Sequence, residues 1–266
     1  MVLGRLASTG LFIMSLVGVQ AAMAADARSV RDAYQCAVHQ HELMTTYHLH
    51  AYEPKDRVTK ADFVGARQVA LECAGRVADD LAAAGLTAKA VEVKNLRDKL
   101  GQTSQYNADS IAGSGTPENA VVAEMVQHEL GLVATLVQSA KDLQQAGKVR
   151  DVAEARQARE LAIMIMYANA RYVERTTEVY HRDDSAEPTI DQLASKFNSG
   201  LTALRASKKL TAEQRKSLDN VNTRFRFING SLNNYTQHAV PGTVNRHARS
   251  MVTLLNQVAN GLEGIK

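Results

Sequence analysis

The sequence predicts an all-α protein that folds as two tandem antiparallel four-helix bundles, a duplicated unit. With four prolines, no tryptophan and 5% aromatic residues, the chain lacks the aromatic enrichment that is typical of strands. Prolines, glycines and capping residues divide it into eight helical segments. Leu86-Thr87-Ala88 recurs as Leu210-Thr211-Ala212 at an offset of 124 residues, which indicates a repeat of about half the chain.

We expect residues 1–24 to be a signal peptide. Arg5 precedes an apolar stretch from Leu11 to Val19, which is followed by Ala22-Met23-Ala24. The stretch is too short to span a bilayer core of ~30 Å as a helix, and Ala-x-Ala suits a signal peptidase. We therefore expect cleavage after Ala24, a periplasmic or secreted location, and no membrane insertion of the mature chain.

The first bundle (residues 25–147) is expected to contain helices over about 27–52, 59–85, 87–112 and 117–147. The first of them ends before Pro54, because the residue that precedes a proline is kept out of helical backbone geometry. The second begins near Thr59 as an N-cap and ends at Gly85. Thr116 caps the fourth helix, and Pro117 takes the first helical position, where a missing N–H is tolerated.

The second bundle (residues 148–266) is expected to contain helices over about 151–181 and 188–207, separated by a polar turn at 182–187, and helices that begin at Thr211 and Pro241. Thr211 and Gln214 form a capping box. The apolar residues of the seventh helix are Leu218, Val221, Phe225, Ile228, Leu232 and Tyr235. Those of the eighth are Val244, Ala248, Met251, Leu255, Val258, Leu262 and Ile265. Spacings of three and four predict helices with one buried face.

The two halves match at equivalent positions. Identical pairs at the offset of 124 are Gln68/Gln192, Ala70/Ala194, Ala82/Ala206, Leu86/Leu210, Thr87/Thr211, Ala88/Ala212 and Pro117/Pro241. The shared Leu-Thr-Ala and the shared proline both stand at expected helix starts. We infer a duplicated four-helix unit of ~120 residues, a normal size for a bundle.

Cys36 and Cys73 are expected to form a disulfide bond. In an antiparallel hairpin, residues at one level are equidistant from the turn, and the midpoint of positions 36 and 73 falls on Pro54 and Lys55. Export would also bring both thiols into an oxidising compartment.

Four histidines lie in the first helix, and their spacing argues against a metal site. His41 and His48 share the inner face, whereas His39 points away from it. Seven residues place His41 and His48 roughly 10.5 Å apart along the axis, too far to share one ion at ~2 Å. We expect core-edge or exposed imidazoles, no metal and no cofactor; Cys-x-x-Cys-His, the haem attachment motif, is absent.

Charge and motifs exclude other functions. The formal charge is +3, and acidic residues are interspersed with the basic ones, so nucleic acid is not an expected partner. Glu124 and His128 have the spacing of a pair on one helix face, but that face lies away from the apolar one. The apolar face is expected at Val122, Val126, Leu130, Val133 and Val137. No nucleophile–base or phosphate-binding signature occurs, so we expect no catalytic residues and no enzyme activity.

The second half resembles the sensor domain of PilJ-type transducers, the N-terminal domain of type IV pilus methyl-accepting chemotaxis transducers. The resemblance rests on Asn222-Thr-Arg-Phe-Arg-Phe-Ile-Asn-Gly-Ser-Leu232, on Val240-Pro241 and on the closing helix to Leu262-Glu263. Ala155-Arg-Gln-Ala-Arg-Glu-Leu161 is similar to the opening motif of the family. The family is related to the sensor domains of nitrate/nitrite-responsive histidine kinases. The resemblance implies helical bundles that bind a small molecule or a protein outside the cytoplasmic membrane.

From this resemblance we expect a non-enzymatic, sensor-like binding or adaptor module that acts through a membrane signalling or envelope protein, linked to pili or chemotaxis. The related nitrate sensors bind an anion through arginine at a dimer interface, which implies a small-anion site at Arg156 and Arg159. Ile163, Tyr167 and Ala170 lie on the same side of the helix as Arg156. A second copy of the chain would cover this side in a homodimer.

Two alternatives remain. Leu210-Thr211-Ala212-Glu213-Gln214 matches the Leu-Thr-x-x-Gln motif of Spy/CpxP-type proteins, which would make the chain a periplasmic chaperone or envelope-stress adaptor. A metal- or haem-binding helical bundle is the third reading, since the chain contains eight histidines and eight methionines.

Overall fold

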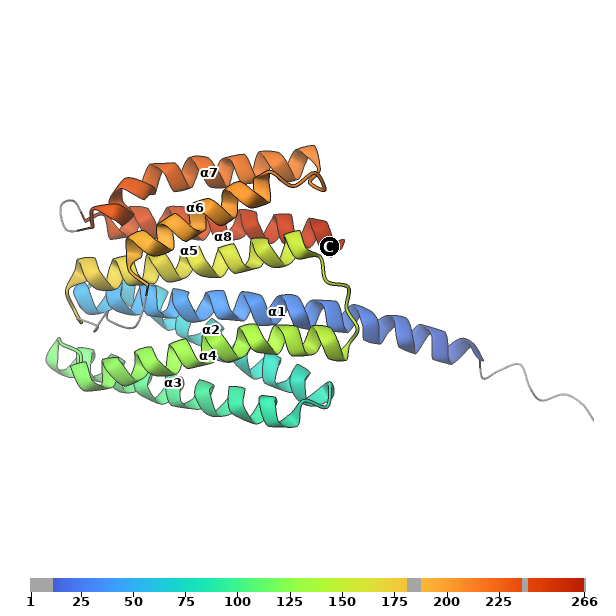
Figure 1. Cartoon of the computed structure of the whole chain (residues 1–266). Coiled ribbons are helices and arrows are strands. Elements are labelled where there is room, and N and C mark those ends of the chain that lie inside the picture. The colour runs from blue at the N-terminus through green and yellow to red at the C-terminus, as the bar shows by residue number, and fades with distance from the viewer. Residues whose placement is uncertain (1–11, 181–187, 236–238, 266) are drawn as a thin grey trace, which may run out of the picture.

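The computed structural model describes residues 12–180, 188–235 and 239–265, with backbone alone for 12–26. This part of the chain is all-α: it forms eight helices and no strand (Figure 1). The helices are α1 (Phe12–Tyr52), α2 (Arg57–Ala83), α3 (Thr87–Ser114), α4 (Asn119–Ala146), α5 (Ala153–Thr177), α6 (Ile190–Arg205), α7 (Ala212–Asn233) and α8 (Pro241–Glu263). The predicted all-α class is therefore confirmed.

The helices pack in two groups of four. In the first group, α1 contacts α2 and α4, and α3 closes the ring between them. In the second group, α5 contacts α6 and α8, and α7 closes the ring in the same way. Each group surrounds its own apolar core. The groups meet where α1 packs against α5, side by side in Figure 1.

Some helix boundaries differ from the predicted ones. α2 begins two residues before Thr59, because Asp56 rather than Thr59 is the N-cap and accepts hydrogen bonds from the backbone of Val58 and Thr59. α2 is followed by Gly85 in the left-handed region at φ 79°, which favours glycine. α5 ends at Thr177 instead of continuing to 181, and the predicted turn at 182–187 lies outside the described residues.

The N-terminal turns of α1 project beyond the other helices (Figure 1). The helix is continuous from Phe12 to Tyr52, so the backbone around Ala24 is helical. Residues 1–11, the first part of the predicted signal peptide, lie outside the described residues. The predicted cleavage after Ala24 falls within α1.

Most of the predicted apolar residues of α7 and α8 are buried; the exceptions, Tyr235, Leu262 and Ile265, are half-buried at or beyond the helix ends. α7 buries Leu218, Val221, Phe225, Ile228 and Leu232. α8 buries Val244, Ala248, Met251, Leu255 and Val258, together with Ala259. Thr211 and Gln214 form the predicted capping box: the Thr211 hydroxyl accepts from the Gln214 N–H at 3.2 Å, and the Gln214 side chain accepts from the Thr211 N–H at 2.9 Å.

Thr211→Ala is expected to lower the free energy of unfolding by about 1 kcal/mol, because it leaves a backbone N–H at the start of α7 without its acceptor. Thr223→Ala is the matched control: Thr223 is exposed within α7, where alanine is the better helix former by roughly 0.5 kcal/mol. Urea unfolding of both variants measures the difference. Equal effects of the two substitutions would contradict the cap.

The buried face of α4 is only partly the predicted one: Val122 and Val126 are buried as predicted. Glu129 lies on the buried face with Val122 and Leu132, whereas Leu130 and Val133 are only half-buried. By length and hydropathy α4 could span a membrane, the one such helix among the described residues. Its contacts with α1 and α3 instead place it in the core of the first group.

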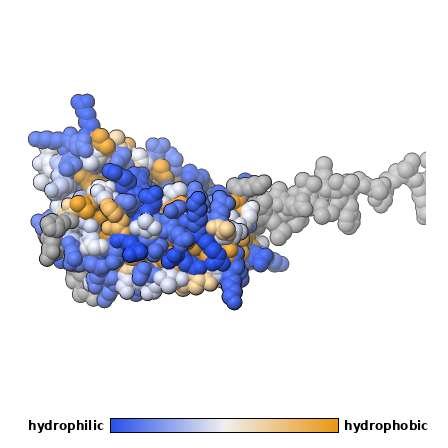
Figure 2. Space-filling model, turned by 90° about the horizontal axis from the view of Figure 1, so that it is seen from above, coloured by the Kyte–Doolittle hydropathy of each residue, from blue (hydrophilic) through white to orange (hydrophobic). Residues whose placement is uncertain are grey.

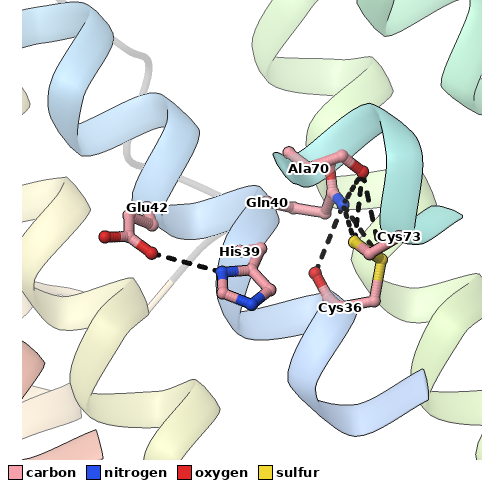
Figure 3. The surroundings of a disulfide bond; sticks show 6 residues. All are labelled: Cys36, His39, Gln40, Glu42, Ala70 and Cys73. Atoms are coloured by element: carbon pink, nitrogen blue, oxygen red, sulfur yellow. Dashed lines mark hydrogen bonds and ion pairs between the residues drawn. A yellow bond between two sulfur atoms is a disulfide. The ribbon is translucent and has the colours of Figure 1, made fainter. Parts of the chain in front are cut away.

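The predicted disulfide between Cys36 and Cys73 is present and joins α1 to α2, with the Cα atoms 5.6 Å apart. Gln40 lies beside it, on the opposite side of α1 from His39 and Glu42 (Figure 3). The Gln40 side-chain amide donates to the Ala70 carbonyl at 2.9 Å. The bond is buried, and it is typical of proteins that fold in an oxidising compartment.

α1 and α5 run in the same direction and cover each other. The ring of His41 stacks on that of Tyr167, with centroids 4.9 Å apart, and Asn169 donates to the Thr45 hydroxyl at 3.2 Å. Ile163 and Ala170 pack against the core of the first group. The side of α5 that a homodimer was expected to cover is thus covered by α1 of the same chain.

Candidate functional site

Arg156 and Arg159, the arginines singled out in the sequence, have different surroundings. Arg156 is partly exposed and pairs with Asp151 at 3.3 Å and with Glu160 at 3.6 Å. The hydrogen bond and charge of Asp151 are the main causes that raise the pKa of Arg156. Both partners are half-exposed, so these pairs are weak in water. A bound anion could therefore replace either carboxylate as the partner of Arg156.

Arg159 is buried, with 1% of its side chain exposed. One terminal nitrogen, Nη2, pairs with Glu263 and donates to the Asn260 side chain at 3.3 Å. Its Nε and Nη1 atoms are buried without a hydrogen-bond partner among the described residues. Since an unpaired buried donor costs about 1–3 kcal/mol, these two N–H groups favour an additional acceptor.

Tyr34 of α1 is the third member of the site. Its side chain is 3% exposed, and its hydroxyl is buried without a partner among the described residues. Burial, followed by the charge of Glu160, raises the pKa of Tyr34 to about 12, although Arg156 acts in the opposite direction. The hydroxyl is therefore protonated at neutral pH and can donate a hydrogen bond.

A cavity of about 330 Å³ opens beside these side chains, where the start of α5 meets α1 and the end of α8. Tyr34, Arg156 and Glu263 line it, and the α4–α5 connection adds further charged side chains. These are Lys148, Arg150 and Asp151. We call it the Arg156 cavity. Arg159 does not line it but is joined to its wall through Glu263.

The composition of the Arg156 cavity suits a small anion. Its lining contains three cationic side chains and two carboxylates, and arginine offers several N–H donors in one plane at any relevant pH. Sequence reasoning found Arg156 and Arg159 but missed Tyr34, Lys148, Arg150 and Glu263. The basic pair around Val149, between two predicted helices, was the only available signal for Lys148 and Arg150.

A second, more open hollow of about 400 Å³ lies between α1 and α8. Glu42 accepts from His39 at 3.2 Å and pairs with Arg249 at 2.5 Å. Burial alone would raise the pKa of Glu42, but these two partners outweigh it, and the pKa is lowered. The charged side chains of this hollow pair with one another, so it makes a weaker candidate for a ligand site.

The histidines of α1 lie deeper than predicted. His41, His48 and His50 are at most 4% exposed, because α1 is covered by α2, α4 and α5. His41 pairs with the buried Glu129, a partner that sequence reasoning did not identify. No group of three or more histidine, cysteine or acidic side chains that could hold a metal occurs in the described part of the chain.

The buried His50 predicts a stability that depends on pH. Burial, followed by the charge of Lys60, lowers the pKa of His50. The folded state therefore binds fewer protons than the unfolded chain near the ordinary histidine pKa, so its stability is full above pH ~6.5 and falls as the pH drops below that value. His50→Phe keeps a ring at this position and is expected to lose less stability than wild type between pH 7 and pH 5.

Urea unfolding of both proteins at pH 7, 6 and 5 provides the measurement. His39→Phe is the control, since His39 is on the same helix but partly exposed. An identical pH dependence in His50→Phe and wild type would contradict the role of His50.

Comparisons of the chain with protein-family models, with curated proteins and with solved structures find no match. The chemistry of the site is therefore inferred from its own side chains.

Proposed function

We propose that this chain is an exported, non-enzymatic binding module of the PilJ sensor type, which takes up a small anion in the Arg156 cavity and acts through a membrane signalling or envelope protein. Cleavage after Ala24 would release residues 25–266 into the periplasm. The buried disulfide supports an oxidising compartment. The observation that carries the binding role is the position of Tyr34, whose buried hydroxyl lacks a partner among the described residues, in a cavity that is also lined by the cations Lys148, Arg150 and Arg156.

The proposal includes a duplication, in which residues 25–147 and 148–266 are equivalent bundles. Helix boundaries support it: α3 begins at Thr87, and Thr211, which lies 124 positions later, is the N-cap of α7. Thr45 and Asn169, which hydrogen-bond across the α1–α5 interface, are also 124 positions apart. In a two-fold symmetric dimer, equivalent residues of the two copies meet in this way near the symmetry axis. A duplicated chain would thus contain its own dimer-like interface.

This arrangement supports the ligand position that the resemblance implies. In the related nitrate sensors the anion lies between two copies of one helix. Here the corresponding helices would be α1 and α5, and the Arg156 cavity lies at one end of their interface, with Tyr34 from α1 and Arg156 from α5. The signal would be a change in the packing of α1 against α5, which a membrane partner could detect.

The chaperone alternative has less support. Thr211 and Gln214, the residues of the Leu-Thr-x-x-Gln match, are both used in the cap of α7. A structural role therefore accounts for them.

A thermal-shift screen tests the binding role. Nitrate, nitrite, acetate, succinate, citrate, phosphate and sulfate are added at 10 mM, each against chloride at equal ionic strength. A ligand at 100 times its Kd stabilises the folded state by about 2.7 kcal/mol, which raises Tm by at least ~5 °C for a chain of this size. We expect at least one of these anions to do so. The absence of any such shift would contradict the proposed ligand class.

Export is tested separately. The protein recovered from the periplasmic fraction is expected to begin at Ala25, as measured by intact mass. A protein that stays with the cytoplasmic fraction and begins at Met1 would contradict export, whatever the outcome of the anion screen.

A further inference from the structure

A cavity of about 240 Å³ lies between the end of α1, the start of α2 and the last turns of α3. It is lined by His50, Phe63, Ala108 and Ile111, with Lys60 and Asp109 among its polar groups. Twenty positions of α1 separate Val30, in the Arg156 cavity, from His50, so the two cavities lie ~30 Å apart. We call this second one the His50 cavity.

Buried aromatic and aliphatic side chains line the floor of the His50 cavity. The rings of His50 and Phe63 stack with their centroids 5.7 Å apart and their planes at 18°. Both side chains are buried, as is Ile111. An apolar floor with aromatic rings suits a planar ligand ring, which gains from stacking as well as from burial. The volume is below the range typical of drug-sized ligands, which limits the occupant to about one ring.

The charges around the His50 cavity favour an anion. Asp109 accepts from Gln105 at 2.8 Å. The Arg67 guanidinium donates to the Ser104 hydroxyl and to the Gly101 carbonyl, each at 2.9 Å. Lys60 makes no ion pair within the described part of the chain and is exposed. Its ammonium is the cation that is free to bind a ligand here.

The unpartnered polar atom of His50 also favours a ligand in this cavity. Its Nδ1 atom is buried and has no hydrogen-bond partner among the described residues, and the side chain is only 4% exposed. Burial and the charge of Lys60 lower its pKa, so the ring is neutral at pH 7. A neutral imidazole can donate or accept a hydrogen bond, depending on the tautomer.

We propose that the His50 cavity binds a small aromatic carboxylate. The ring of the ligand packs against Phe63 and His50, its carboxylate pairs with Lys60, and a polar substituent on the ring bonds to Nδ1 of His50. This site is independent of the Arg156 cavity and does not rest on the proposed anion-sensing role.

Fluorine NMR with 4-fluorobenzoate tests the proposal. The probe is titrated with the purified protein, and 4-fluorobenzyl alcohol serves as the matched neutral probe with the same ring. We expect saturable binding of 4-fluorobenzoate with a Kd at or below about 1 mM, and binding of the alcohol about three times weaker, since a partly exposed ion pair contributes roughly that factor. No saturable binding of 4-fluorobenzoate would overturn the proposal.

Variants locate the bound probe. Ala108→Leu fills the cavity and is expected to raise the Kd at least tenfold; Ala112→Leu, at an exposed position of the lining, does the same with less risk to folding. Lys60→Gln is expected to raise the Kd about threefold, whereas Lys55→Gln, an exposed lysine outside the lining, leaves it unchanged. An unchanged Kd in both leucine variants would overturn the proposal. So would a loss of binding in Arg156→Gln, because it would place the probe in the Arg156 cavity.

Discussion

Reduction of the Cys36–Cys73 bond is expected to lower the free energy of unfolding by about 4 kcal/mol. The bond closes a loop of 37 positions, and its removal returns the corresponding entropy to the unfolded chain. The thiols would stay buried next to Gln40, whose amide donates to the Ala70 carbonyl and to the Cys36 carbonyl. The contacts between α1 and α2 therefore remain available in the reduced protein, and the loss is mainly one of loop closure.

Urea unfolding with and without a phosphine reductant measures this loss. The double variant Cys36→Ala/Cys73→Ala is the control, because it should unfold near the midpoint of the reduced wild type and be insensitive to the reductant. A reduced wild type as stable as the oxidised protein would contradict the expectation.

His41→Leu is expected to lower the free energy of unfolding by about 3–5 kcal/mol. His41 and Glu129 pair at 3% and 2% side-chain exposure, and removal of one partner leaves the other buried and unpaired. The double variant His41→Leu/Glu129→Leu is expected to be more stable than His41→Leu alone, since it leaves no unpaired carboxylate buried at this position.

His39→Leu is the matched control on the same helix. Its bond to Glu42 is partly exposed, so the loss should stay below about 1 kcal/mol. Urea unfolding of wild type, His41→Leu, Glu129→Leu and the double variant gives the coupling between His41 and Glu129, and His39→Leu is unfolded beside them. A loss below about 1 kcal/mol in His41→Leu would contradict the buried pair.

The sequence predicts most of the buried residues of α7 and α8, because each of these helices buries a single face that apolar residues mark; Tyr235, Leu262 and Ile265, near the helix ends, are only half-buried. The same reasoning was only partly right for α4, where Val122 and Val126 are buried but Leu130, Val133 and Val137 are half-buried. Glu129 occupies a position on the buried face, and a carboxylate there counts as surface in any hydropathy pattern. Its partner, His41, is 88 positions away along the chain, and no local pattern connects two such positions.

The interface between α1 and α5 shows a second limit. Apolar residues on more than one side of α5, among them Tyr167 and Ala170, indicate that the helix is covered all round, but they do not say by what. The predicted homodimer and the observed contact with α1 satisfy this pattern equally well. The offset of 124 residues was the informative signal, since it pairs Thr45 with Asn169, the two residues that meet.

The candidate site was only partly predictable. The resemblance drew attention to Arg156 and Arg159, but it did not indicate that Arg159 is buried and pairs with Glu263, 104 positions away. Tyr34 looked like an ordinary core residue of α1. On the face of the molecule seen in Figure 2, apolar side chains lie scattered among polar ones, and there too hydropathy alone gives no indication of a site.

Isothermal titration calorimetry tests the central claim most directly, with the most stabilising anion of the screen as titrant. Wild type is compared with Arg156→Gln and Tyr34→Phe, and with Arg76→Gln as control, because Arg76 is exposed on α2 and lies outside the Arg156 cavity. A Kd at least ten times higher in Arg156→Gln, severalfold higher in Tyr34→Phe and unchanged in Arg76→Gln is the predicted result. Equal affinity in all four proteins would show that the anion does not bind in the Arg156 cavity.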